Sequence, residues 1–288
     1  MALALSAAWL PLDAQSTRRD QLLVSVDWLA AHREDRGIIL LHVGPEDAYA
    51  KEHIPGARFV GHGHREGPDG LVLELPPADE LEARLEALGV SNDSKIVVYW
   101  GEEWVTPTTR LVFEIDWAGL GDRAVVLDGG LGAWKARGQP VTAERPTVKP
   151  GALTLEPRQD LVVDAEYVQG LANPAHGTAL VDGRARAFYD GVREDGGRNG
   201  HIPGAVSVPW TELVDESIRF RTAEEMRTLF AAAGIRPGDT VVAYCHIGQY
   251  ATAVLFAART LGHEVKLYDG AFQDWARRDL PVETGTSR

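Results

Sequence analysis

Short hydrophobic runs rich in β-branched residues alternate with amphipathic segments along most of the chain. The runs predict strands at 38–43, 95–100, 124–127, 179–182, 240–244 and 265–268. Apolar residues at helical spacing predict helices at 78–88, 106–120, 222–235 and 250–261, the third opened by a capping box of Thr222 and Glu225. Strands that alternate with helices are typical of an α/β fold with a mainly parallel sheet and helices on both faces.

The same order of elements occurs twice. The segment HIPGA stands at 53–57 and again at 201–205, an offset of 148 residues, and the tryptophans that close the units, Trp134 and Trp275, are 141 residues apart. A period of that length indicates a duplicated domain rather than a solenoid. We therefore predict one domain over 20–142, a linker with three prolines over 143–159, and a second domain over 160–288.

Composition and net charge indicate which partners and which cellular compartment to expect. The chain has 288 residues, of which 44% are hydrophobic and 25% charged, and a net charge of −13, which disfavours nucleic acid and anionic membranes as partners. A single cysteine excludes an intramolecular disulfide and favours a reducing compartment, so we expect a cytoplasmic protein. The apolar start, residues 1–15, is too short to span a membrane, and a signal peptide for export to the periplasm is the alternative.

The lone cysteine, Cys245, stands between the predicted strand at 240–244 and the predicted helix at 250–261. In parallel sheets this junction holds ligands, and the N–H groups at a helix start favour an anion. We expect the thiol there to lose its proton readily and to act as a nucleophile, with a buried structural cysteine as the alternative. The first copy has Trp100 at this position, followed by Glu102 and Glu103, so we expect it to be chemically silent.

Taken together, these motifs resemble those of the tandem-domain rhodaneses, the thiosulfate and 3-mercaptopyruvate sulfurtransferases. The resemblance spans roughly residues 20 to 285 and uses the paired HIPGA segments, Asp182-Gly183-Arg184, VPWTEL at 208–213, the Cys245 loop, and Asp269-Gly270 with Trp275. It implies two tandem rhodanese-like α/β domains and a loop, 245–250, whose amides hold a persulfide on Cys245. A sulfur donor would load the cysteine, and cyanide or another thiophilic acceptor would unload it, without a metal or an organic cofactor.

The resemblance leaves more than one sulfur donor possible. Thiosulfate-type loops have basic residues just after the cysteine, where this chain has His246 and Ile247, and the family's substrate arginine falls at Phe188. We favour thiosulfate, with 3-mercaptopyruvate or a protein partner that exchanges sulfur as alternatives. The predicted donor-binding residues comprise the rest of the loop, three nearby arginines and one tryptophan: His246, Ile247, Gly248, Gln249, Tyr250, Arg186, Arg193, Arg198 and Trp210.

For several other candidate residues we weigh a structural role against a functional one. We expect Asp182 and Arg184 to form a pair that positions loops rather than to take part in chemistry, and His246 either to add positive field beside the thiolate or to face solvent. His62 and His64 have metal-like spacing, but a surface turn is favoured because only Glu66 is near. A cysteine phosphatase needs an arginine six residues after the cysteine, where this chain has Ala251.

Overall fold

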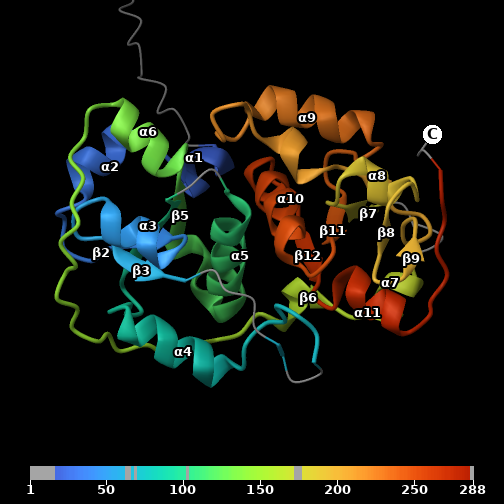
Figure 1. The fold of residues 1–288 in the computed structure, drawn as a ribbon, viewed down its shortest axis with the longest axis horizontal. Coiled ribbons are helices and arrows are strands. Elements are labelled where there is room, and N and C mark those ends of the chain that lie inside the picture. Colours follow the sequence, from blue (N-terminus) through green and yellow to red (C-terminus); the bar gives the residue numbers. More distant parts are fainter. Residues whose placement is uncertain (1–16, 62–65, 68–69, 102–103, 172–176, 286–288) are drawn as a thin grey trace, which may run out of the picture.

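A computed structural model of the chain describes residues 17–61, 66–67, 70–101, 104–171 and 177–285. It contains two five-stranded parallel sheets, one from each half of the sequence, side by side in Figure 1. The first sheet has the order β1-β5-β4-β2-β3, from β1 (Leu23–Val24), β5 (Ala124–Leu127), β4 (Lys95–Trp100), β2 (Ile38–Val43) and β3 (Arg58–Val60). The second has the equivalent order β6-β12-β11-β7-β10, from β6 (Val162–Val163), β12 (Val265–Tyr268), β11 (Thr240–Tyr244), β7 (Thr178–Asp182) and β10 (Val206–Ser207).

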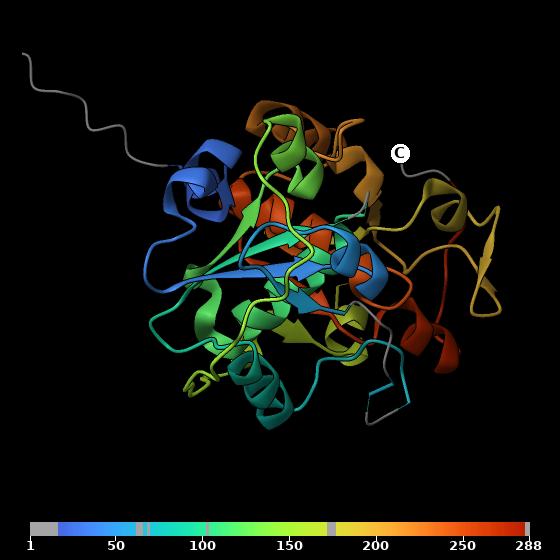
Figure 2. The ribbon, with the colours of Figure 1, turned by 60° about the vertical axis from the view of Figure 1, so that its left-hand side comes forward.

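Helices cover both faces of each sheet (Figures 1 and 2). Those of the first half are α1 (Arg18–Leu22), α2 (Val26–His32), α3 (Glu46–Lys51), α4 (Ala78–Ala87), α5 (Thr106–Ile115) and α6 (Gly130–Ala136). Those of the second half are α7 (Ala165–Gln169), α8 (Arg186–Tyr189), α9 (Ala223–Ala232), α10 (Gln249–Thr260) and α11 (Ala271–Arg277). The second half also has an antiparallel hairpin of β8 (Glu194–Asp195) and β9 (Arg198–Asn199).

The two halves repeat their internal contacts as well as their topology. In each, the histidine of HIPGA bonds through Nδ1 to a tyrosine carbonyl, the strand tyrosine accepts a bond from the HIPGA isoleucine, and the closing tryptophan donates to a proline carbonyl. The equivalent pairs are His53 and His201, Tyr49 and Tyr189, Ile54 and Ile202, Tyr99 and Tyr244, and Trp134 and Trp275. These buried polar contacts are therefore part of the shared architecture.

The hydrophobic core is arranged by the alternation of side chains along the strands. In β4, Val97 and Tyr99 join the core on the outer face of the first sheet, while Ile96, Val98 and Trp100 join an inner core. That inner core is continuous with the inner face of the second sheet and includes α5 and α10, which lie against each other at the centre of Figure 1. The two halves thus share one apolar interior.

One predicted helix ends early. The prediction of a helix over 106–120 is correct up to Ile115, after which the chain makes a π-helical turn, Asp116–Leu120. Gly119 in that turn has φ of +88°, and a Cβ there would lie 2.6 Å from the Glu156 carbonyl oxygen. The left-handed glycine and the close approach of the following chain account for the change.

Between the two halves, residues 143–158 contain neither helix nor strand and run along α4. The backbone N–H groups of Leu153 and Leu155 donate to Glu86 and Glu82, two carboxylates of that helix, at 2.8 and 3.1 Å. Leu153 is buried as well. The segment is therefore held against the first half rather than free in solvent.

Candidate active site

Cys245 directly follows β11, and α10 begins at Gln249 after a left-handed Gly248 (φ +84°). This turn directs the backbone N–H groups of Ile247, Gly248, Tyr250 and Ala251 to the Cys245 sulfur. Four amide donors around one sulfur form a site that favours negative charge on that sulfur or on an atom bound to it. The predicted junction of strand, loop and helix is confirmed, with the helix starting one residue earlier than expected.

The expected ease of ionisation is wrong in direction. Only 1% of Cys245 is exposed, and this burial raises the pKa of its thiol, while the four amides oppose the shift without cancelling it. Burial removes hydration from the thiolate, and this destabilises the charged form by more free energy than the amide dipoles provide. The sulfur therefore stays protonated to a higher pH than a free cysteine.

A cavity of about 200 Å³ opens beside the sulfur. Its lining consists of Trp104 and five residues of the loop: Cys245, His246, Ile247, Gln249 and Tyr250. Trp104 comes from the first half of the chain, and the Gln249 amide donates to Thr106 Oγ1 at 3.1 Å across the same boundary. The cavity consequently lies where the two halves meet, and the sequence pattern did not reveal Trp104.

His246 is tied to a carboxylate that the sequence analysis missed. Its Nδ1 lies 2.5 Å from Asp195 Oδ2, and both side chains are about one-fifth exposed, at 23% and 22%. Asp195 belongs to the β8–β9 hairpin, 51 residues earlier in the chain. Burial alone would raise the pKa of Asp195, but the hydrogen bond and charge of His246, together with Arg184, lower it below its ordinary value.

Asp182 and Arg184 form the expected pair and are fully buried. Arg184 holds Asp182 in a fork, with Nε 3.1 Å from Oδ1 and Nη2 2.7 Å from Oδ2. The same guanidinium donates to the Gly200 carbonyl at 2.7 Å and to Asp195 Oδ2 at 3.1 Å. The pair thus anchors the segment that carries Asp195.

Three arginines predicted to bind the donor are not among the residues that line the cavity. Arg186 pairs with Glu212 at 3.0 Å, with 54% of its side chain exposed. Arg198 pairs with Asp279, and the Arg193 guanidinium lies 4.6 Å from the centre of the Phe188 ring. Their role in donor binding stays a prediction.

Trp210, one of the predicted donor-binding residues, begins a short 3₁₀ turn (Trp210–Leu213). Its ring centre lies 5.7 Å from that of Tyr250, so it backs a residue that lines the cavity. Gly248 likewise contributes its amide to the sulfur rather than a surface to the cavity.

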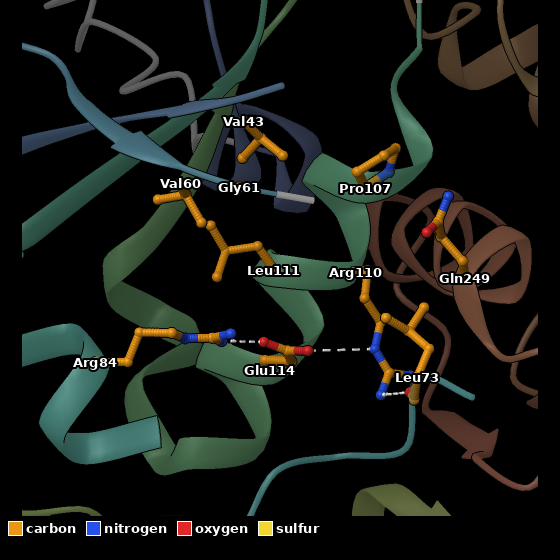
Figure 3. A pocket seen from close by; sticks show the side chains of 10 residues that line it. All are labelled: Val43, Val60, Gly61, Leu73, Arg84, Pro107, Arg110, Leu111, Glu114 and Gln249. Atoms are coloured by element: carbon orange, nitrogen blue, oxygen red, sulfur yellow. Dashed lines mark hydrogen bonds and ion pairs between the residues drawn. The ribbon is translucent and has the colours of Figure 1, made fainter. Parts of the chain in front are cut away.

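An ionic cluster in the first half reaches across to the second half through Arg110. Figure 3 shows Glu114 between Arg84 and Arg110, beside a small cavity of about 40 Å³. Arg110 also donates to the Leu73 carbonyl at 2.6 Å and to Asp269 Oδ1, in the second half, at 2.9 Å. The guanidinium of Arg110 lies close enough to Gly248 that a Cβ there would be 3.1 Å from Nη1.

Several early expectations concern residues outside those described, namely His62 and His64, Glu102 and Glu103, and residues 1–15. Among the described residues, no group of three or more histidine, cysteine, aspartate or glutamate side chains could hold a metal ion. Within the same part of the chain, no helix has the length and apolar character needed to cross a membrane.

The chain is similar over most of its length to known proteins of one family. A family model described as "Rhodanese-like domain" matches residues 25–137 and 164–278. The chain is 31% identical to a sulfur carrier protein of Thermus thermophilus, covering 92% of this chain and 97% of the relative. It is 27% identical to a putative thiosulfate sulfurtransferase of Synechococcus elongatus, covering 97% and 90%.

Among solved structures, a 3-mercaptopyruvate sulfotransferase from Escherichia coli with the "Rhodanese" fold has a TM-score of 0.75. It is 30% identical, over 86% of this chain and 98% of that one. The chain therefore belongs to the rhodanese-like sulfurtransferase family, with two tandem domains of that fold.

Proposed function

We propose that the protein transfers the outer sulfur of thiosulfate to a thiophilic acceptor such as cyanide, through a persulfide on Cys245. The observation that supports this most is the set of four backbone amides around a buried cysteine that opens onto a cavity. A site of that form stabilises negative charge on a sulfur attached to the cysteine.

The proposed chemistry has two half-reactions. The Cys245 thiolate attacks the outer sulfur of thiosulfate, a new sulfur–sulfur bond forms, and the donor's own sulfur–sulfur bond breaks to release sulfite. Cyanide carbon then attacks the outer sulfur of the persulfide, thiocyanate leaves, and the thiolate is regenerated. The amides hold the anionic outer sulfur between these steps.

We place this chemistry in the second domain, 160–288, and regard the first, 20–142, as silent. Tyr99 and Tyr244 are equivalent, so Trp100 takes the place of Cys245. The Trp100 ring packs against Gly130, where a Cβ would come within 2.7 Å of the indole. An indole at this position has no thiol that could carry a sulfur.

The names of similar proteins favour two further candidates. One is 3-mercaptopyruvate as donor, in which the carbon–sulfur bond breaks and the carbon takes up a proton as pyruvate leaves. The other is a sulfur carrier, in which a thiol protein receives the sulfur from Cys245. Both use the same persulfide.

Intact-protein mass spectrometry tests the proposal. Incubation with thiosulfate should add one sulfur, about 32 Da, and cyanide should remove it. Cys245→Ser should show no gain while retaining its unfolding midpoint. A sulfur gain that survives in Cys245→Ser would exclude the mechanism, and faster loading by 3-mercaptopyruvate would assign that donor instead.

A further inference from the structure

A chain of alternating charges runs from the buried interior of the second domain to the cavity. Asp182 is forked by Arg184, Arg184 bonds to Asp195 at 3.1 Å, and Asp195 bonds to His246 at 2.5 Å. The exposed fraction of the side chains rises from 0% for the first two to 22% and 23% for the last two. With a neutral imidazole the chain carries a net charge of −1, whereas an imidazolium makes it neutral.

The silent first domain is an internal control for what the fold itself requires. His42 lies opposite Tyr99 as Asp182 lies opposite Tyr244, so His42 replaces Asp182, Gly44 replaces Arg184, and Gly101 replaces His246. Because the first domain folds with the same topology, the charged chain is not an architectural requirement.

The segment that carries Asp195 has no counterpart in the first domain. The equivalent Tyr49 and His53 are four positions apart in the sequence, whereas Tyr189 and His201 are twelve positions apart. The eight additional residues of the second domain include the β8–β9 hairpin and Asp195. The domain with the cysteine therefore has an insertion that brings a carboxylate to His246.

Aromatic rings complete the surroundings of His246. The rings of Phe188 and Tyr250 both lie nearly perpendicular to the imidazole. Their ring centres are 4.6 and 5.8 Å from that of His246. The titratable and charged groups around it are thus Asp195, with Arg184 behind, the thiol of Cys245, the phenol of Tyr250, and Arg193 over Phe188. Asp195 is the group among these that bonds to the imidazole directly.

We propose that Asp195 is a positioning residue that holds His246 as an imidazolium on the cavity wall, where it binds the anionic part of the sulfur donor. Donor binding then depends on the positive charge of the imidazolium, because without it the charged chain has a net negative charge that faces an anion. This inference rests on the proposed sulfur transfer. The pKa of Asp195 is lowered by the hydrogen bond and charge of His246 and by Arg184, which agrees with this arrangement.

The test measures persulfide loading by mass spectrometry at several thiosulfate concentrations between pH 6 and 9, over which thiosulfate stays a dianion. At pH 6, His246→Gln should raise the half-saturating thiosulfate concentration about 10- to 100-fold, because one charge-assisted hydrogen bond to the donor is lost. The maximal loading rate should change much less. By pH 9 the difference from the unmodified protein should nearly vanish.

Two further variants separate charge from structure. His246→Arg should keep donor binding constant across the range, since its charge does not titrate. Asp195→Asn should raise the half-saturating thiosulfate concentration at pH 6, because the imidazole loses the carboxylate that orients it. His32→Gln, at a half-buried histidine of α2 in the first domain, is the matched control and should behave as the unmodified protein.

The inference fails if His246→Gln and Asp195→Asn keep both the half-saturating concentration and its pH dependence while Cys245 still loads. If the unmodified protein does not load from thiosulfate or 3-mercaptopyruvate at any pH, the proposed function itself fails. The two failures are therefore distinguishable.

Discussion

His42 occupies in the first domain the position that Asp182 has in the second. It is fully buried in β2, its Nδ1 lies 3.1 Å from the Tyr99 hydroxyl, and its Nε2 has no hydrogen-bond partner among the described residues. Burial, with a smaller effect of His53, lowers the pKa of His42 from 6.5 to about 4. The ring therefore remains neutral in the folded protein at pH values where the unfolded chain is already protonated.

This difference predicts a loss of stability in acid. Between pH 6.5 and 4 the unfolded state binds more protons than the folded state, so the free energy of unfolding falls as pH falls. From pH 7 to 4.5 this one group should account for on the order of 2 kcal/mol. Chemical denaturation of His42→Gln should show a decline in the free energy of unfolding that is smaller by that amount. The control variant His32→Gln should show the same decline as the unmodified protein.

If the free energy of unfolding of His42→Gln fell with pH as steeply as that of the unmodified protein, the buried neutral imidazole would not be the cause of the acid sensitivity. The comparison uses changes between two pH values within each variant. A constant cost of the substitution therefore cancels.

At the scale of the elements, the turn into α10 depends on Gly248. Its φ of +84° suits glycine, and an added Cβ would lie 3.1 Å from the guanidinium of Arg110 and 3.4 Å from the Asp269 carbonyl oxygen. Gly262, just beyond the other end of the same helix, has φ of +89° and nothing within 4 Å of such a Cβ. The two glycines share a backbone requirement but differ in their surroundings.

We therefore predict different outcomes for the same substitution. Gly248→Ala and Gly262→Ala should each lose about 1 to 2 kcal/mol from the left-handed backbone. Gly248→Ala should in addition slow persulfide loading about 10- to 100-fold, because the amides around the sulfur must shift. Loading that is slowed equally in both variants would show that the crowding at Gly248 is irrelevant.

Local sequence determined the longer strands and the start of α9. The strands at 38–43, 95–100, 124–127, 240–244 and 265–268 match the structure at both ends, and the capping box of Thr222 and Glu225 opens α9 as predicted. These features depend on neighbouring residues, namely a buried apolar run or a side chain that caps its own helix.

Contacts between distant residues were not accessible in the same way. Trp104 and Asp195 reach the site from other elements, 141 and 50 residues before Cys245, and nothing in their local sequence indicates a shared destination. The pKa of Cys245 depends on burial by the whole fold, which the junction motif does not specify. The helix expected to run to residue 120 was cut short by the chain that crosses Gly119.

At the scale of the whole molecule, Arg110 joins the two domains through buried charges. Its side chain is 3% exposed, and its partners Glu114 and Asp269 are 4% and 13% exposed. Although burial disfavours the charged guanidinium, Asp269 and Glu114 raise the pKa of Arg110 above its ordinary value. Removing the cation would leave carboxylates in a poorly hydrated interface.

Arg110→Ala should accordingly lower the free energy of unfolding by about 3 to 5 kcal/mol, the cost of breaking a buried ion pair from one side. Arg145→Ala, which removes an exposed pair with Glu46 at 2.7 Å, should cost about 1 kcal/mol or less. Urea denaturation of both variants checks the contrast. Similar losses in the two would mean that the interface is well hydrated.

The inner core that runs through α5 and α10 has a consequence for the independence of the two halves. Deletion of the first half would remove the apolar cover from the face of the sheet that positions the cysteine. The first half is therefore one wall of an interior that both halves share. The repeat unit of the sequence is accordingly smaller than the unit that buries its own apolar surface.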